Sequence, residues 1–156
     1  PLQMAVMTAR LINGGRAVKP KLLKLEGERN QFGPSLKLNP GHLKIVMEGM
    51  NRVTNGSQGT ARKVQNPSSK FNFGGKSGSV QVKRISLNDR LTGKIKNEDR
   101  PWKERDHAMF VAYAPIKSPR YVTSVVVEHG GGGSTMAAPI ARDILEQTMR
   151  LDPSRF

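Results

Sequence analysis

The sequence of 156 residues contains no cysteine, which excludes disulfide bonds and thiolate metal sites. Aromatic residues make up only 5% of it, so the core must be built mainly from Val, Ile, Leu, Met and Ala. No apolar run approaches the ~18 to 20 residues that are needed to cross a bilayer. This length and composition predict one domain with a modest aliphatic core.

Acidic residues are also scarce, since 12 Asp and Glu stand against 26 Lys and Arg and give a formal net charge of +14. Such a charge suits nucleic acid, anionic membrane surfaces or acidic polymers, and does not choose among them. The few aromatic residues are not interleaved with the basic ones, and none of the common recognition modules is present. A basic, solvated surface is therefore favoured over nucleic-acid binding.

Histidine is rare as well. His42, His107 and His129 are scattered without the spacing of metal ligands, so we expect no metal site and no cofactor. The sequence begins at Pro1, directly within a helical pattern, and shows neither an initiator methionine nor a signal peptide. We therefore expect a longer chain whose targeting and anchoring segments lie upstream.

Two helices are predicted in the first third of the chain. Apolar spacing indicates an amphipathic helix over residues 1–13, which the glycines that follow would end. Residues 16–38 are irregular and basic, so we expect an extended surface connector with its lysines in solvent. Asn39-Pro40 is a good helix start, and Asn55-Gly56 a good end. A core stripe is expected between them at Leu43, Val46, Met47, Met50 and Val53.

The rest of the chain predicts three strands and a closing helix. Alternation over residues 79–85 indicates a strand, with Lys76-Ser77-Gly78 at its mouth. The runs HAMFVAYAP (107–115) and YVTSVVVEH (121–129) indicate an antiparallel hairpin with a turn at residues 115–119. After glycines 130–133, a helix is marked by Ala137, Ile140, Ala141, Ile144, Leu145 and Thr148 and ends near Asp152-Pro153. Helices and strands in this order predict an α+β fold.

Two glycine-rich stretches invite a phosphate-binding interpretation. The letters GGKS match the end of G-x-x-x-x-G-K-[ST], but Lys70 stands where the first glycine is needed and the lysine precedes a strand instead of a helix. The run from Gly130 to Ser134 lacks a lysine and the G-x-G-x-x-G spacing. A flexible or close-packed connection is the better interpretation of that run.

The position of Lys76-Ser77-Gly78 on a strand narrows the chemistry that these three residues can perform. Adjacent strand residues point to opposite faces, so the lysine and serine side chains cannot simply converge. The glycine removes a side chain that would block a substrate lying against that edge. A cation and a hydroxyl there could hold the carboxylate of an extended acyl substrate.

Four segments, in order and with compatible spacing, resemble the C-terminal part of the transpeptidase domain of class B penicillin-binding proteins, closest to the elongation type, penicillin-binding protein 2. They are PLQMAVMTARLINGG, GGKSGSVQV, HAMFVAYAP and VVVEHGGGGSTMAAPIARDILE. The resemblance covers nearly all of residues 1–156, which we interpret as the C-terminal segment of a single transpeptidase domain, incomplete without upstream residues.

The family carries the motifs S-x-x-K, S-x-N and K-[ST]-G in that order. Only the third can be placed here, at residues 76–78. No S-x-x-K exists in the chain, and Ser86-Leu87-Asn88 follows the lysine motif instead of preceding it, so we treat it as an accident. The resemblance therefore implies that the nucleophile, its lysine partner and the second-motif serine lie upstream.

The resemblance also implies roles for the residues that are present. Lys76 would supply positive charge and help proton transfer, while Ser77 and Ser79 would hydrogen-bond the terminal carboxylate of the substrate. The backbone N–H of Ser79 would be an oxyanion donor, and Gly78 would lie against the substrate. The implied reaction is the serine-dependent cross-linking of peptidoglycan stem peptides during cell-wall elongation, which β-lactam antibiotics trap as an acyl-enzyme.

The implied fold is a five-stranded antiparallel sheet between helices, of which this chain would supply the last three strands. Such a segment would expose a strand edge and an apolar sheet face, so we expect it to need the upstream part of the domain in order to fold well. The implied location is the periplasmic face of the bacterial inner membrane, beside a glycosyltransferase of the elongation machinery.

Two other functions remain open from the sequence. One is a basic module that binds nucleic acid or an anionic polymer, and the other is a serine β-lactamase or hydrolase relative, because those enzymes share K-[ST]-G. The polar segment from Ser86 to Asp106 also allows two interpretations. We hypothesise that it flanks the substrate groove or contacts a partner through Trp102, with a disordered insertion as the alternative.

Overall fold

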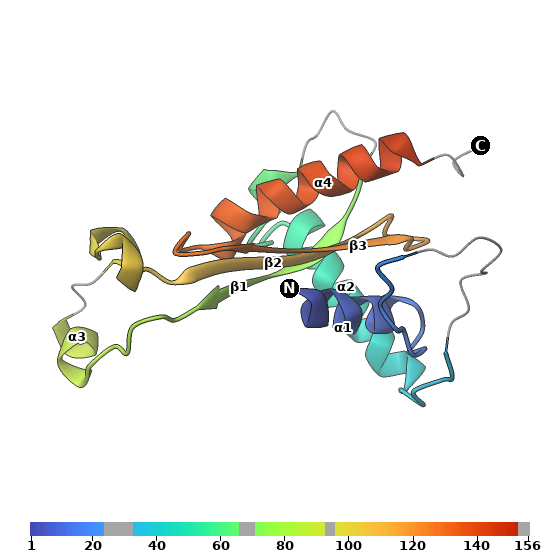
Figure 1. Ribbon diagram of the computed structural model, residues 1–156, viewed down its shortest axis with the longest axis horizontal. Helices are drawn as coiled ribbons and strands as arrows, with labels where there is room; N and C mark the ends of the chain where they lie inside the picture. Colours follow the sequence, from blue (N-terminus) through green and yellow to red (C-terminus); the bar gives the residue numbers. More distant parts are fainter. Residues whose placement is uncertain (24–32, 66–70, 93–95, 153–156) are drawn as a thin grey trace.

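The computed structural model describes residues 1–23, 33–65, 71–92 and 96–152. Its centre is an antiparallel sheet of strands β1 (Gly74–Val80), β2 (His107–Ala114) and β3 (Tyr121–Val127), in that order. Helices α1 (Leu2–Ile12) and α2 (Pro40–Asn55) cover one face, and α4 (Ala138–Leu151) covers the other (Figure 1). The predicted α+β fold is confirmed.

The central strand β2 packs on both of its faces. Phe110 and Ala112 contact the cluster that includes α4, whereas Val111 and Tyr113 contact Met50 and the residues of α1. Burial on both sides explains why residues 110–114 form one continuous buried run instead of an alternating one. The sheet is therefore packed between two apolar layers, one on the side of α4 and one on the side of α1 and α2.

The two N-terminal helices have almost their predicted bounds. The Asn39 side chain caps α2 by accepting a hydrogen bond from the Gly41 N–H at 2.8 Å. Within the predicted core stripe Leu43 and Met50 are buried, but Val46 is 42% exposed, so the core face is narrower than expected.

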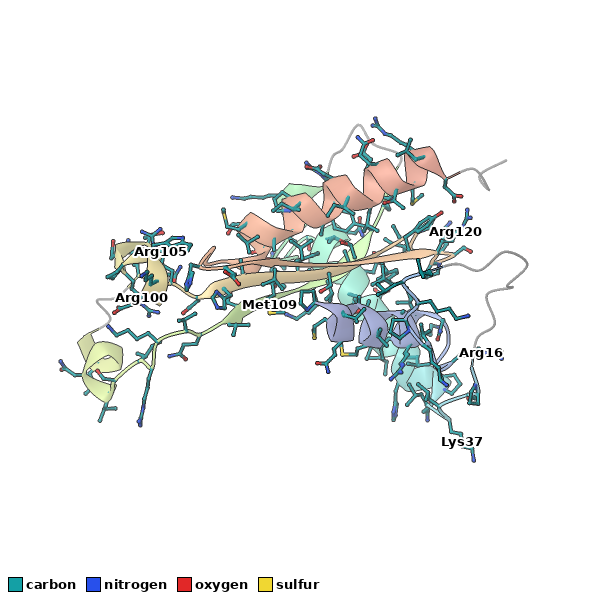
Figure 2. The ribbon with its side chains drawn as sticks, viewed as in Figure 1. Arg16, Lys37, Arg100, Arg105, Met109 and Arg120 are labelled. Atoms are coloured by element: carbon teal, nitrogen blue, oxygen red, sulfur yellow. The ribbon has the colours of Figure 1, made fainter. Side chains whose placement is uncertain are left out.

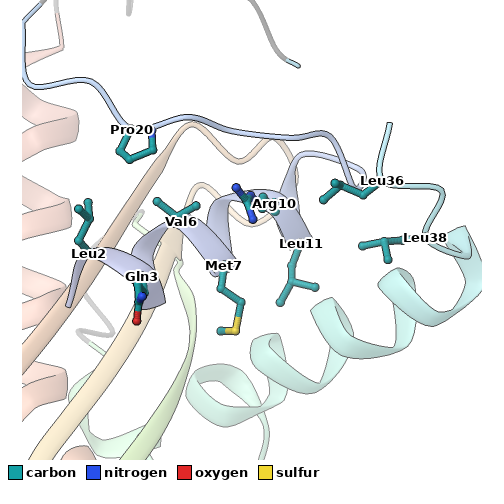
Figure 3. Close-up of a pocket in the computed structure, with 9 residues that line it drawn as sticks. All are labelled: Leu2, Gln3, Val6, Met7, Arg10, Leu11, Pro20, Leu36 and Leu38. Carbon is teal, nitrogen blue, oxygen red and sulfur yellow. The ribbon is translucent and has the colours of Figure 1, made fainter. Parts of the chain in front are cut away.

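The predicted connector after α1 is confirmed for its described residues. It lies over the outer side of α1, where Pro20, Leu36 and Leu38 border a groove of about 440 Å³ (Figure 3). Lys19, Lys21 and Lys37 are exposed, while the expectation for Lys24 lies outside the described residues.

Strand β1 corrects the prediction, because it covers Gly74–Val80 and not 79–85. The reason is its partner: the ladder with β2 ends at the pair Val80 and His107, and Val82 beyond it is 41% exposed. Gly74 and Gly75 allow the earlier start, since a Cβ there would overlap the rings of Tyr113 and Phe110. Lys76-Ser77-Gly78 therefore lies in the middle of the strand and not at its mouth.

The segment 86–106 is also different from the expected irregular loop. It contains α3 (Leu87–Thr92) and two short 3₁₀ turns, η2 (Asn97–Asp99) and η3 (Trp102–Glu104), while residues 93–95 lie outside the description. Trp102 is 57% exposed, and its ring lies 4.5 Å from that of His129. Its ring therefore packs beside His129, at the end of the hairpin.

The glycine run and the closing helix follow β3 as predicted. A single π-helical turn, η4 (Gly133–Ala137), leads directly into α4. A Cβ on Gly133 would overlap backbone atoms of Met109 and Gly78, so the run is the close-packed connection that was one of its two interpretations. Within α4, Ile140 and Ile144 face outward, at 43% and 46% exposure. The predicted helix is confirmed, and these two residues lie on its exposed face.

Candidate active site

The candidate site lies on β1, at an edge of the sheet. Lys76 is paired with Val111, Ser77 with Phe110 and Gly78 with Met109. Because β1 has a single neighbour among the described strands, its outer edge is unpaired there. The register puts Lys76 on the α1 and α2 face with Val111, and Ser77 on the opposite face, as the alternation predicted.

The Lys76 side chain nevertheless turns toward the strand edge. Its Nζ donates a hydrogen bond to the Ser77 carbonyl oxygen at 2.7 Å. Lys76 and Ser79 are exposed, whereas Ser77 and Gly78 are half-buried. The ammonium group and the Ser77 backbone therefore meet at one point of the edge, although their side chains leave the strand on opposite faces.

A largely apolar cavity of about 440 Å³ borders this edge between α1, α2, β1 and β2. Lys76, Ser77 and Gly78 all contribute to its wall. The remaining lining residues are Met4, Met7, Thr8, Leu11, Val46, Gly49, Met50, Val53, Met109, Phe110 and Val111. Thr8 already uses its hydroxyl within α1, where it donates to the Met4 carbonyl oxygen at 2.9 Å. The cavity therefore offers apolar surface directly beside a lysine.

Two residues at the end of α2 fix where β1 begins. Thr54 is fully buried, and its hydroxyl donates to the Phe73 carbonyl oxygen at 2.5 Å. The Asn55 side-chain amide donates to the same oxygen at 3.1 Å. The role of Thr54 could not be predicted from the sequence, and Asn55 was expected only to end α2, because a contact between residues 19 positions apart leaves no periodic signal.

Tyr113 of β2 packs against the same end of β1. It is fully buried opposite Gly74, and its hydroxyl donates to the Met47 carbonyl oxygen at 3.4 Å. Burial raises the pKa of the Tyr113 phenol above its ordinary value, and the negative charge of Glu48 adds to the rise. The phenol therefore stays neutral and can donate at any pH near neutrality.

The described part of the chain offers neither a cluster of metal ligands nor a membrane-spanning helix. Its His, Asp and Glu residues form no group of three or more that could hold a metal ion. Across those same residues, each helix is too short or too polar to cross a membrane.

Comparison with known proteins places this geometry in a family. A model of the penicillin binding protein transpeptidase domain matches residues 1–146. The peptidoglycan D,D-transpeptidase MrdA of Haemophilus influenzae is 35% identical over 155 residues, which are 94% of this chain and 23% of that protein. The protein of the same name from Escherichia coli is 28% identical over 96% of this chain and 24% of its own length. The chain thus spans about a quarter of these curated relatives.

Solved structures agree. The chain superposes on Pseudomonas aeruginosa PBP2, crystallised in complex with WCK 5153, with a TM-score of 0.72 and 34% identity, covering 98% of this chain and 31% of that one. Against PBP2 from Helicobacter pylori in its complex with MreC, the TM-score is 0.74 and the identity 25%, over 97% of this chain and 25% of that one. The chain therefore belongs to the penicillin-binding protein transpeptidase family, as a C-terminal portion of a transpeptidase domain of the penicillin-binding protein 2 type.

Proposed function

We propose that this chain supplies the substrate-holding strand of a peptidoglycan D,D-transpeptidase site. The observation that carries the proposal is the position of Lys76, Ser77 and Gly78 in the middle of a strand with an open outer edge. An extended peptide can pair with such an edge through main-chain hydrogen bonds. The family membership supports the assignment of these residues to the third motif.

In the proposed reaction a serine from the upstream part of the domain attacks the penultimate D-Ala carbonyl of a stem peptide. The C–N bond to the terminal D-Ala breaks, that residue leaves with the proton, and an ester joins the stem to the serine. The amine of a neighbouring stem then attacks the ester, which forms the cross-link and restores the hydroxyl. β-Lactams would stop this sequence at the ester.

The residues of β1 take the following parts in it. The Ser77 and Ser79 hydroxyls hydrogen-bond the terminal carboxylate, and the Ser79 N–H donates to the oxyanion, a contact that is typically worth ~10²- to 10³-fold in rate. The Lys76 ammonium supplies positive charge beside the reacting atoms and carries protons. Gly78 has no side chain, so it leaves room for the substrate backbone beside the strand.

The apolar cavity beside Lys76 supports an intramolecular partner. Its wall is made by methionines and aliphatic residues, which suits a packed helix better than a polar substrate. We assign it to the upstream part of the same domain, which carries the nucleophile and the first two strands. In that complete protein the site would face the periplasm, with a glycosyltransferase of cell-wall elongation as a further partner.

Labelled penicillin tests the proposal in a protein that joins this chain to its upstream region. The double variant Lys76→Ala, Ser77→Ala should lose acylation. The chain also contains a matched Lys-Ser pair in the hairpin turn, both residues of which are exposed, so Lys117→Ala, Ser118→Ala should be acylated normally. The isolated 156 residues should not be acylated.

Undiminished acylation of the Lys76 and Ser77 double variant would show that the site is wrongly assigned. Rapid release of the label would favour the hydrolase alternative. Binding to nucleic acid that falls steeply with salt, with a log-log slope of about −0.9 per phosphate, would favour the polymer-binding module.

A further inference from the structure

Beyond Val80 the chain leaves the sheet and borders an open groove of about 550 Å³. The groove is lined by Gln81, Lys83, Arg84, Ile85 and Leu87. Figure 1 shows that this part of the chain, together with α3, projects past the end of the sheet and away from the helices. The groove is thus continuous with β1 but separate from the cavity beside Lys76.

The groove carries two exposed cations, Lys83 and Arg84. Lys83 Nζ lies 2.7 Å from a carboxylate oxygen of Glu104, a residue of η3. The Gln81 side-chain amide donates to the Lys83 carbonyl oxygen at 2.6 Å, which holds the chain in its bend after the strand. Figure 2 shows Arg100 and Arg105 at the same end of the molecule. Arg100 is paired with Asp106 at 3.2 Å, so the positive charge offered to an acidic ligand comes from Lys83, which shares its charge with Glu104, and from Arg84.

Strand geometry determines which part of a bound peptide would reach this groove. A peptide that pairs with β1 in the antiparallel direction places its carboxyl end beside Lys76 and Ser77, and its amino-terminal residues beside Val80 and beyond. A strand advances ~3.4 Å per residue. With the penultimate residue beside Ser79, the residues before it pass Val80 and Gln81 and come within reach of the long Lys83 and Arg84 side chains.

We propose that this groove binds the amino-terminal part of the donor peptide, and that Lys83 and Arg84 select donors with a carboxylate two or three residues before the penultimate one. The inference rests on the proposed function, which provides the direction of the peptide. Charge complementarity and continuity with the β1 edge support an acidic peptide as the occupant. Glu104 positions Lys83 for the contact, and the ligand carboxylate shares the ammonium group with it.

The test uses the protein in which this chain is joined to its upstream region. Two synthetic peptides ending in D-Ala-D-Ala are compared, one with Glu and one with Gln at the selected position, and the release of D-Ala gives kcat/KM for each. The Glu peptide should be preferred by about 3- to 10-fold at low salt, as partly exposed ion pairs allow, and the preference should shrink as salt is added. The double variant Lys83→Ala, Arg84→Ala should bring the ratio close to one.

The ratio is internal to each protein sample, so it reports selectivity even where a substitution lowers overall activity. Lys83→Glu, Arg84→Glu should reverse the preference. The variant Lys19→Ala, Lys117→Ala removes two exposed cations elsewhere and should keep the wild-type ratio. Equal use of the two peptides by the unaltered protein, or a preference that survives the loss of Lys83 and Arg84, overturns the inference. Failure of benzylpenicillin to acylate the unaltered protein would instead overturn the proposed function, because that short compound does not reach the groove.

Discussion

A methyl group on Gly133 of η4 should disturb β1, the strand that carries the candidate site, although the two are far apart in the sequence. An added Cβ would lie 2.5 Å from the Gly78 carbonyl oxygen and 2.9 Å from the Gly78 nitrogen, and closer still to the carbonyl oxygen of Met109. These are backbone atoms of two paired strands, so no side chain can rotate away. Overpacking of this kind costs ~1–3 kcal/mol, and we expect Gly133→Ala to lower the free energy of unfolding by that amount.

Gly78→Ala provides the comparison. A Cβ there would meet only the Cβ of Met109, at an ordinary 3.5 Å. Loss of a strand glycine should leave stability unchanged or raise it by ~0.5–1 kcal/mol, whereas the methyl group would project from the sheet face beside Lys76, next to the edge proposed for the substrate. In the protein that joins this chain to its upstream region, both variants should therefore be acylated slowly by labelled penicillin, but only Gly133→Ala should unfold at lower urea concentration.

The two variants can refute different steps of the reasoning. If Gly133→Ala unfolds within ~0.5 kcal/mol of the unaltered protein, the close approach of η4 to β1 is not a constraint. If Gly78→Ala is acylated at the normal rate, the open edge beside residue 78 is not where the substrate lies.

Two further predictions concern the start of β1. Thr54→Val should lower the free energy of unfolding in urea by ~1–3 kcal/mol, because it removes a buried hydrogen bond. Thr148→Val loses an exposed hydrogen bond within α4 and should change the same free energy by less than ~0.5 kcal/mol. Equal effects of the two substitutions would contradict the anchoring role of Thr54. The raised pKa of Tyr113 favours the neutral phenol in the folded state, so its contribution is complete below pH ~10 and is lost as the pH rises through the folded pKa. In Tyr113→Phe the free energy of unfolding should therefore decrease less as the pH rises above ~10. An unchanged decrease would show that ionisation of Tyr113 does not cause it.

Much of the fold could be predicted from local signals. The proline and asparagine at the start of α2 and the two β-branched runs of the hairpin are properties of neighbouring residues, and they gave nearly correct bounds. The position of β1 could not be predicted in this way. Its glycines look like a loop until the rings of Phe110 and Tyr113 are in place, and the alternating residues after Val80 have no partner strand.

For the site, the motif Lys76-Ser77-Gly78 could be found because it is contiguous. The residues that position it, Thr54 from α2 and Gly133 from η4, come from other parts of the chain and carry no motif. The groove after Val80 was missed for a similar reason, since the contact of its Lys83 with Glu104 spans 21 positions and leaves no local signal.

The unequal connections within the sheet have a kinetic consequence. Six residues join β2 to β3, but 26 join β1 to β2. By loop-closure entropy alone, the longer connection costs about 1.3 kcal/mol more to close, so the hairpin can form before β1 adds to it. By the same entropy, β1 is the strand most readily released from the sheet in local opening. Among the three described strands, β1 is thus the one expected to join the sheet last, and the peptide proposed to pair with its edge would also stabilise that strand.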